Sequence, residues 1–203
     1  NELLKYNNIE AVSLTSHVPA AGISWGADYK RNVDDPEWTQ VEYFSVDEDY
    51  LENMEVKLVA GRFFRADQQS TNKNYLVLNE TAVSKLHFST PEEAIGQELI
   101  SHYDSARLTI IGVVQDYNHR DLTRTISPMA LVCNPERFGV MQVRYGGEYP
   151  AAAQVVEKAW AAVNPGLKVD YKEVSSEIHQ FYEVVFGDLA TVLSVIAFLA
   201  IFI

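Results

Sequence analysis

An apolar run at the C-terminal end, interrupted only by Thr191 and Ser194, constrains this sequence more than any other feature. Residues 189–203 read LATVLSVIAFLAIFI and contain no charged side chain. At about 1.5 Å of rise per residue they would form roughly 22 Å of helix, against about 30 Å of bilayer hydrocarbon. A buried helix of a soluble core would normally keep a polar stripe, and this run is apolar on every side. We therefore expect the start of a transmembrane helix that is cut off before it finishes, with a buried C-terminal helix of a soluble core as the alternative.

The charges before the apolar run predict its orientation. The last basic residue is Lys172, and the segment after it carries Glu173, Glu177, Glu183 and Asp188. Cytoplasmic flanks of membrane helices are enriched in Lys and Arg, and this flank is acidic. We therefore expect residues 1–188 to lie on the periplasmic or outer side of the membrane.

The overall charge excludes several classes of partner. The sequence has 16 Lys and Arg against 28 Asp and Glu, which gives a formal net charge of −12. Nucleic-acid binding and docking on an anionic membrane surface both need clustered basic side chains. The single cysteine, Cys133, excludes an internal disulfide and also a zinc site that needs two or more cysteines. Cys133 lies in an apolar segment, where we expect it to behave as a small buried hydrophobic residue.

Hydrophobic patterning predicts a mixed α+β fold. We expect strands over residues 9–16, 40–46, 56–60, 75–78, 108–114, 129–133, 140–145 and 167–174. We expect helices over residues 47–54, 79–86, 91–95 and 150–163, and from about residue 176 into the apolar run. Asp47, Asn79 and Thr90 are the predicted N-caps. Polar loops are expected over residues 20–37 and 67–74.

The motifs for common enzyme classes are absent from the sequence. It has no phosphate-binding loop of the Gly-x-x-x-x-Gly-Lys-Ser/Thr type, no Gly-x-Ser-x-Gly elbow and no His-Glu-x-x-His zinc helix. The most metal-like group is Asp116, His119 and Asp121, directly after the strand at 108–114. We interpret these three as turn formers and surface polar residues. We expect no catalytic, cofactor-binding or metal-binding residues, and no cofactor.

Two further groups of residues have a structural and a functional interpretation. Asp47, Glu48 and Asp49 could suggest calcium, but no glycine follows at the required spacing, and acids are favoured at the start of a helix. Three tryptophans could line a ligand pocket. Trp160 fits the apolar face of its helix, whereas Trp25 and Trp38 lie in or beside a loop and are freer to contact a partner or ligand.

Four segments, in this order, resemble one protein family. They are YFSVDEDYLENMEVKLVAGRFF (residues 43–64), YLVLNETAV (75–83), EEAIGQEL (92–99) and LTIIGVVQDYNHRDLTRTISPMAL (108–131). They are similar to the MacB-like periplasmic core domain of FtsX-type ABC-transporter permeases. The resemblance covers essentially the whole sequence, and the tail at 176–203 is similar to the family's stalk helix where it enters a membrane helix.

The resemblance implies a domain organisation. It implies a porter-like, βαβ-rich extracytoplasmic subdomain formed from residues 1–86 and 136–175. A smaller β-rich subdomain, residues 87–135, would be inserted between these halves. Residues 176–203 would form the stalk and the start of a transmembrane helix.

The resemblance also implies a non-enzymatic function in the inner (plasma) membrane. The domain would couple ATP-driven motion of a cytoplasmic ABC ATPase to substrate export or release, or to a periplasmic or outer-membrane partner. A second permease copy would complete a dimer. The alternatives are the ligand-sensing domain of a membrane receptor and a membrane-anchored hydrolase, although the hydrolase lacks a recognisable nucleophile or metal motif.

Overall fold

The structure is a computed structural model that describes residues 2–19, 25–120, 124–180, 182–183 and 186–187. The chain divides into two compact units, Asn1–Val155 and Val156–Ile203. The strands are β1 (Ile9–Thr15), β2 (Trp25–Lys30), β3 (Thr39–Ser45), β4 (Leu58–Gly61), β5 (Tyr75–Asn79), β6 (Glu98–Ser101), β7 (Arg107–Val114), β8 (Met129–Val132) and β9 (Val140–Tyr145). The helices are α1 (Tyr50–Met54), α2 (Gln69–Asn72), α3 (Glu80–Lys85), α4 (Pro91–Ala94) and α5 (Tyr149–Val163), with short 3-10 turns η1 (Leu3–Lys5), η2 (Ala66–Gln68) and η3 (Pro135–Arg137).

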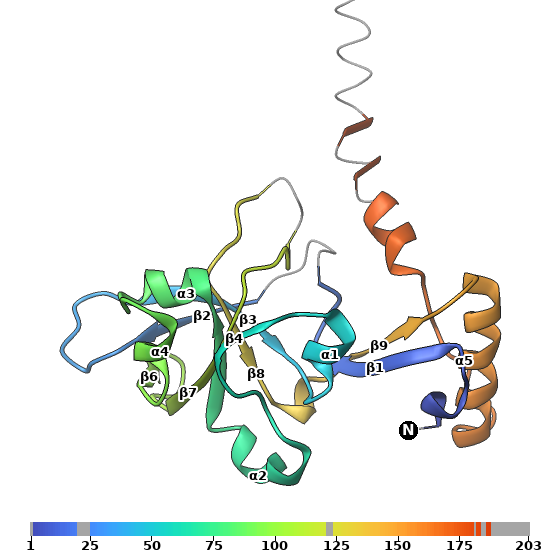
Figure 1. Ribbon diagram of the computed structural model, residues 1–203, viewed down its shortest axis with the longest axis horizontal. Coiled ribbons are helices and arrows are strands. Elements are labelled where there is room, and N and C mark those ends of the chain that lie inside the picture. Colours follow the sequence, from blue (N-terminus) through green and yellow to red (C-terminus); the bar gives the residue numbers. More distant parts are fainter. Residues whose placement is uncertain (1, 20–24, 121–123, 181, 184–185, 188–203) are drawn as a thin grey trace, which may run out of the picture. The chain divides into compact units, whose positions relative to one another are not determined.

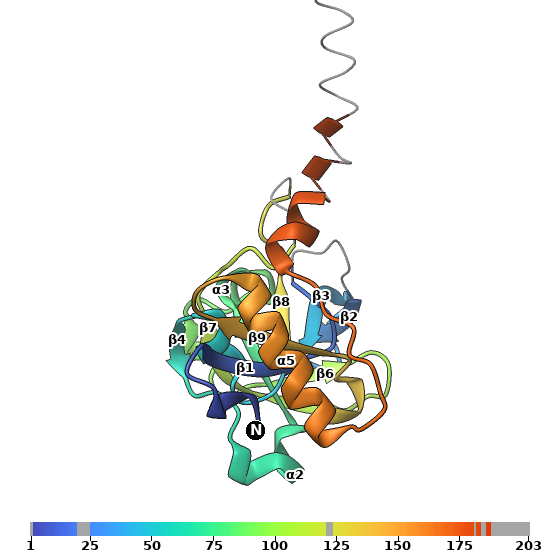
Figure 2. The same ribbon diagram turned by 90° about the vertical axis from the view of Figure 1, so that its right-hand side faces the viewer.

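Seven strands of the first unit form a mixed sheet in the order β4-β7-β5-β8-β3-β2-β6 (Figures 1 and 2). The β3–β8 and β5–β7 pairs are parallel, and the other pairs are antiparallel. Strand β6 pairs with β2 on one side and with β7 on the other, so the sheet closes into a ring. We call these strands, β2 to β8, the ring sheet.

Each face of the ring sheet carries an apolar core. One core contains the buried faces of α3 and α4, including Ala82, Val83 and Ala94. The other contains Tyr50 of α1 and Phe64, packed against Val77 and other residues of the sheet. Because both faces are covered, the central strands are apolar almost throughout, as in a sheet buried on both sides.

The remaining two strands of the first unit form a separate antiparallel pair. Strand β1 pairs with β9 from Thr15 opposite Val140 to Ile9 opposite Tyr145, with one irregularity near the Ile9 end. The chain enters the ring sheet after β1 and leaves it before β9. We call the β1–β9 pair the neck, because both connections of the ring sheet pass through it.

Much of the predicted secondary structure is confirmed. The mixed α+β class is correct, and seven of the predicted strands lie within two residues of β1, β3, β4, β5, β7, β8 and β9. The N-caps at Asn79 and Thr90 are also correct. The Asn79 side chain accepts the Ala82 N–H at 2.9 Å, and the Thr90 hydroxyl accepts the Glu93 N–H at 3.2 Å.

Four sequence predictions were wrong. The expected loop at 20–37 contains β2, and the expected loop at 67–74 contains the turns η2 and α2. The expected strand at 167–174 is not a strand, since an alternating pattern needs a neighbouring strand to supply its hydrogen bonds. Asp49 rather than Asp47 precedes α1, because the Asp47 carboxylate is occupied by the Leu14 N–H of β1.

The C-terminal expectations fall at the edge of the described chain. Residues 174–180, 182–183 and 186–187 are helical. Within the part of the chain that the structure describes, no helix is both long and apolar enough to cross a membrane. The expected transmembrane segment, residues 189–203, lies outside the described residues.

Candidate functional site

The site develops from the long loop between β7 and β8, in which Asp116 is the second residue. The Asp116 carboxylate accepts the Thr81 N–H at 3.0 Å and the Thr81 hydroxyl at 2.6 Å. In return, Glu80 accepts the Asp116 N–H at 3.0 Å. These bonds fix the start of the loop to the first turn of α3.

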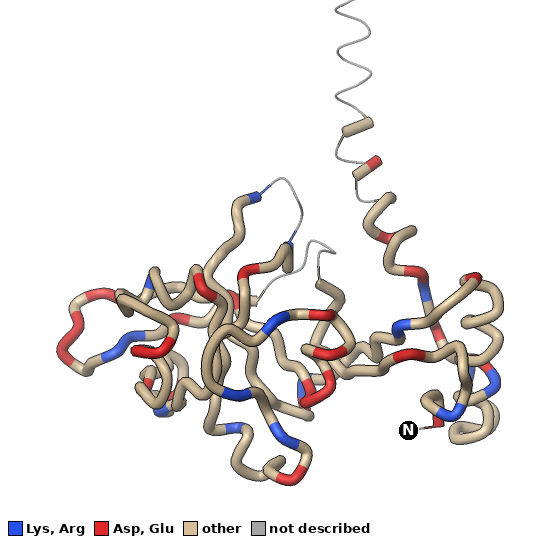
Figure 3. Tube along the Cα trace, viewed as in Figure 1, with Lys and Arg blue, Asp and Glu red and all other residues tan. Residues whose placement is uncertain are grey.

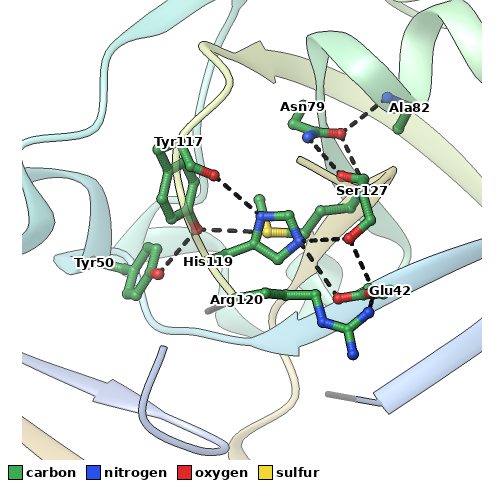
Figure 4. A network of polar contacts seen from close by, with 9 residues as sticks. Glu42, Tyr50, Asn79, Ala82, Tyr117, His119, Arg120 and Ser127 are labelled. Carbon is green, nitrogen blue, oxygen red and sulfur yellow. Dashed lines mark hydrogen bonds and ion pairs between the residues drawn. The ribbon is translucent and has the colours of Figure 1, made fainter. Parts of the chain in front are cut away.

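Two buried phenols fix the next step of the loop (Figure 4). The hydroxyls of Tyr50 and Tyr117 are 2.9 Å apart, and the Tyr117 hydroxyl also lies 3.5 Å from the sulfur of Met129. Burial raises the pKa of Tyr50 to about 12 and raises the pKa of Tyr117 well above its usual value. Both phenols are therefore neutral near pH 7, and the contact joins the loop to α1 and β8.

His119 is the most buried polar side chain of the loop, with 1% of its surface exposed. Its Nδ1 lies 3.2 Å from the Tyr117 carbonyl, which can only accept, so Nδ1 carries a proton. Its Nε2 lies 3.4 Å from Glu42 Oε2 and 3.5 Å from Ser127 Oγ. Burial lowers the pKa of His119, although Glu42 and the Tyr117 carbonyl oppose this, so the neutral ring is favoured at pH 7.

Glu42 of β3 connects the two arms of the loop. Its Oε1 accepts Arg120 Nη1 at 2.7 Å and the Ser127 hydroxyl at 3.0 Å. The Glu42 backbone N–H donates to the Pro128 carbonyl at 2.9 Å. A single carboxylate therefore holds both ends of the segment 120–127 against the ring sheet.

Asn79 secures the return of the loop to β8. Besides capping α3, its Oδ1 accepts the Met129 N–H at 2.8 Å, and its Nδ2 donates to the Ser127 carbonyl at 3.0 Å. Figure 4 shows these side chains converging from β3, α1, the β5–α3 junction and both arms of the loop.

The arrangement does not form a hydrolase triad. In such a triad the serine hydroxyl faces one ring nitrogen of the histidine, and the carboxylate binds the other nitrogen. Here Ser127 and Glu42 both face Nε2 of His119, and the Ser127 hydroxyl donates to Glu42 instead. The group anchors a loop and does not activate a nucleophile.

The interpretation of the Asp116 and His119 side chains as surface polar residues was wrong. Asp116 is half-buried and bound to Thr81, and His119 is buried; Asp121 lies outside the described residues. The sequence does carry a signal, because four polar or aromatic side chains with hydrogen-bonding groups directly follow a buried strand. Their partners Glu42 and Tyr50 lie far away in sequence, and no local pattern identifies them.

The other candidates have structural surroundings. Cys133 is a free, buried thiol, and burial raises its pKa to about 11, so it is protonated near neutral pH. Asp47, Glu48 and Asp49 lead into α1, and Asp47 is buried. Among the described residues, no three His, Cys, Asp or Glu side chains are grouped as a metal site would require.

The three tryptophans have different environments. Trp25 belongs to β2, is 36% exposed, and lies near the rings of His17 and Tyr43. Trp38 is 38% exposed and lies beneath the Lys30 ammonium, 4.6 Å from the ring centre. Trp160 is half-buried and donates its indole N–H to the Leu167 carbonyl at 3.0 Å.

The neck is joined to the ring sheet by main-chain hydrogen bonds. The Ser16 N–H donates to the Ser45 carbonyl at 2.8 Å, and the Asp47 N–H donates to the Leu14 carbonyl at 3.1 Å. The Gly139 N–H donates to the Thr15 carbonyl at 2.9 Å, so the entry and exit of the ring sheet meet at one end of β1.

Comparison with solved structures places this fold among the periplasmic and extracellular domains of ABC-type transporters. The periplasmic region of MacB from Actinobacillus actinomycetemcomitans matches with a TM-score of 0.55 and 17% identity, over 79% of this chain and 70% of that one. The extracellular domain of the noncanonic ABC-type transporter YknZ from Gram-positive bacteria matches with a TM-score of 0.55 and 12% identity, over 80% and 78%.

The family follows from the sequence profile. The profile of the MacB-like periplasmic core domain matches residues 2–180, and the chain belongs to this family. The resemblance seen in the sequence is thereby confirmed. Among curated proteins, no sequence matches this chain significantly.

Proposed function

We propose that this chain is the extracytoplasmic domain of an ABC-transporter permease and transmits ATP-driven motion rather than performing chemistry. The family match over residues 2–180 carries this proposal. The His119 group has the geometry of a loop anchor, since its serine hydroxyl donates to the Glu42 carboxylate. The receptor alternative has no comparable support.

The neck offers a route for the motion. Both connections to the ring sheet pass through β1 and β9, which are paired along their length. A displacement applied to this pair moves the ring sheet as one body, because the sheet closes on itself through β6 and β7. The anchored loop at 116–128 adds stiffness to that body.

The surrounding assembly is part of the proposal. Residues 176–203 would form a stalk that enters a transmembrane helix, and a cytoplasmic ABC ATPase would supply the motion. A second permease copy and an envelope partner complete the assembly. The pairing of β1 with β9 supports a porter-like part built from both ends of the domain, whereas the limits 1–86, 87–135 and 136–175 stay a prediction.

Amide hydrogen exchange in the complete permease tests the proposal. The permease and its ATPase are reconstituted in proteoliposomes, and exchange is compared with and without ATP. We expect ATP to change exchange in peptides covering residues 174–187 and the neck. An ATPase variant that binds ATP without hydrolysing it should hold the permease in one of these two exchange patterns. Identical exchange in all conditions would count against coupling through this domain.

A further inference from the structure

The contact between the neck and the β3–α1 segment is lined with buried polar groups. The Asn53 amide of α1 donates to the Ser13 hydroxyl of β1 at 2.7 Å and to the Gln142 carbonyl of β9 at 3.1 Å. Ser13, Asn53, Gln142 and Asp47 are each at most 9% exposed. We call these four residues, together with Leu14, the seam. It lies where α1 adjoins β1 in Figure 1.

The seam is short of hydrogen-bond donors. Oδ1 of Asp47, Oδ1 of Asn53 and Oε1 of Gln142 are buried, and none of them has a hydrogen-bond partner. A buried polar group that lacks a partner lowers the stability of the contact that contains it. The ring sheet, by contrast, has apolar cores on both faces. The seam therefore joins the neck to the ring sheet through incompletely paired polar contacts rather than through an apolar core.

Asp47 is the charged member of the seam and holds β1 at two points. Its Oδ2 accepts the Leu14 N–H at 2.6 Å, and its own N–H donates to the Leu14 carbonyl at 3.1 Å. The turn that leads into α1 is acidic, with Glu48 and Asp49 following Asp47 (Figure 3). An ionised Asp47 thus places a buried negative charge close to the carboxylates of Glu48 and Asp49.

We propose that the seam is a proton-dependent joint, in which protonation of Asp47 tightens the attachment of β1 to β3 and α1, and ionisation loosens it. The inference rests on the proposed coupling function and extends it, because it identifies the seam as the contact that opens. Its evidence lies in the seam alone, and it does not require that anything is transported.

The charges around Asp47 agree with this direction. Burial raises the pKa of Asp47 to about 6, and the charges of Asp49 and Glu48 add to the rise, whereas the backbone N–H groups of Leu14 and Asp49 oppose it. From the end of β8, the nearest titratable group is the Cys133 thiol, which stays protonated over this range. From β1, the facing group is the Leu14 amide. The closed seam therefore binds the proton more tightly than an opened seam, in which Asp47 is solvated.

Exchange of the Leu14 amide measures this opening directly. Exchange in the complete chain is followed in peptides covering residues 10–17 at pH 5 and pH 7.5, with correction for the intrinsic rate. With a pKa of about 6 in the closed seam and a normal value in the open one, linkage predicts about tenfold more opening at pH 7.5. Peptides from β5 and β7 should keep constant protection.

Variants separate the joint from a general effect of pH. Asp47→Asn, which keeps an oxygen for the Leu14 N–H but carries no charge, should abolish the tenfold change. Asp49→Asn should move the change to lower pH and retain it. Asp116→Asn, at another carboxylate that accepts a backbone N–H, should behave as the unmodified chain. Wild-type protection that does not vary with pH, or a change that persists in Asp47→Asn, would overturn the proposal. A variant that loses transport while the pH dependence of Leu14 exchange stays as in wild type would count against the proposed coupling function, but not against the proton-dependent joint.

Discussion

Single side chains hold the long loop after β7 in place. Asn79 shows which of their hydrogen bonds the local sequence predicts and which it does not. Its position before an apolar helical pattern predicts the N-cap of α3, and the structure has that bond. The same amide also binds Ser127 and Met129, which are 48 and 50 residues away. Such long-range partners depend on the sheet order, which local patterning does not contain.

Replacing His119 should lower the stability of the fold. His119→Ala removes a buried ring and leaves the Tyr117 carbonyl without the Nδ1–H donor in a site closed to water, so we expect a loss of about 2–4 kcal/mol. Asn118→Ala, at the exposed neighbouring position, should change stability little. Urea unfolding measures both. A near-neutral His119→Ala would restore the interpretation of this side chain as a surface turn residue.

The free energy of unfolding should carry a pH dependence that belongs to Asp47. Its pKa is raised in the folded state, so its contribution is fully present below its unfolded value near 4 and is lost as the pH rises through about 6. Asp47→Asn should therefore gain stability relative to wild type on going from pH 4 to pH 7, on the order of 2 kcal/mol. The difference between the two proteins is the relevant quantity, because the lowered pKa of His119 gives an opposite slope in both. A difference independent of pH would rule out the assignment.

At the scale of elements, the strands with continuous or alternating apolar residues could be predicted, and β2 and β6 could not. Strand β2 reads WGADYK and β6 has only four residues, so neither has a recognisable period. Both strands exist because neighbouring strands supply their hydrogen bonds. Strand β2 pairs with β3 and β6, and strand β6 pairs with β2 and β7. Gly61, one residue beyond the predicted strand at 56–60, lies at the end of β4 with a φ of +74° that favours glycine.

A pair of glycines allows β4 to approach β7 closely, and Gly112 should not tolerate a side chain. Gly61 lies opposite Gly112, and a Cβ added at Gly112 would be 2.3 Å from the Arg62 carbonyl oxygen. Gly112→Ala should destabilise the fold by about 3 kcal/mol, since backbone has to move. Gly26→Ala meets only the Gln40 side chain at 3.4 Å and serves as the control. Equal thermal stability of the two variants would show that β4 can shift freely.

At the scale of the whole molecule, the sequence identified the family before the structure did, because four ordered motifs lie in the ring sheet and its loops. The pairing of β2 with β6, which completes the closed sheet, and the pairing of β1 with β9 could not be predicted, since both join segments more than sixty residues apart. Their functional consequence is that the two ends of the domain meet in the neck. Under the proposed function, motion applied at the neck would be passed to the whole ring sheet.

The apolar segment 189–203 should be dispensable for folding. In water it presents apolar surface without a bilayer, which favours aggregation. A chain ending at Gly187 should be more soluble than the full chain and equally stable in urea unfolding. A loss of several kcal/mol, the scale expected when the apolar contacts of a buried helix are removed, would place the segment in the core.

Glu183→Pro tests whether a stiff stalk couples ATP hydrolysis to transport. Glu183 belongs to the helical residues 182–183, and its carboxylate pairs with His179 at 3.1 Å. Proline there removes a backbone hydrogen bond and kinks the helix, at a local cost of about 3 kcal/mol. Glu183→Ala removes only the exposed ion pair and should behave almost as wild type.

The measurement is ATP hydrolysis and transport by the full-length permease, reconstituted with its ATPase. We expect Glu183→Pro to hydrolyse ATP at a near-normal rate while transport falls at least tenfold, with expression and the folded spectrum of the domain unchanged. Glu183→Ala should retain both activities. Normal transport by the proline variant, combined with inactive but folded Asp116→Ala or His119→Ala variants, would contradict mechanical coupling and indicate a chemical site in the loop.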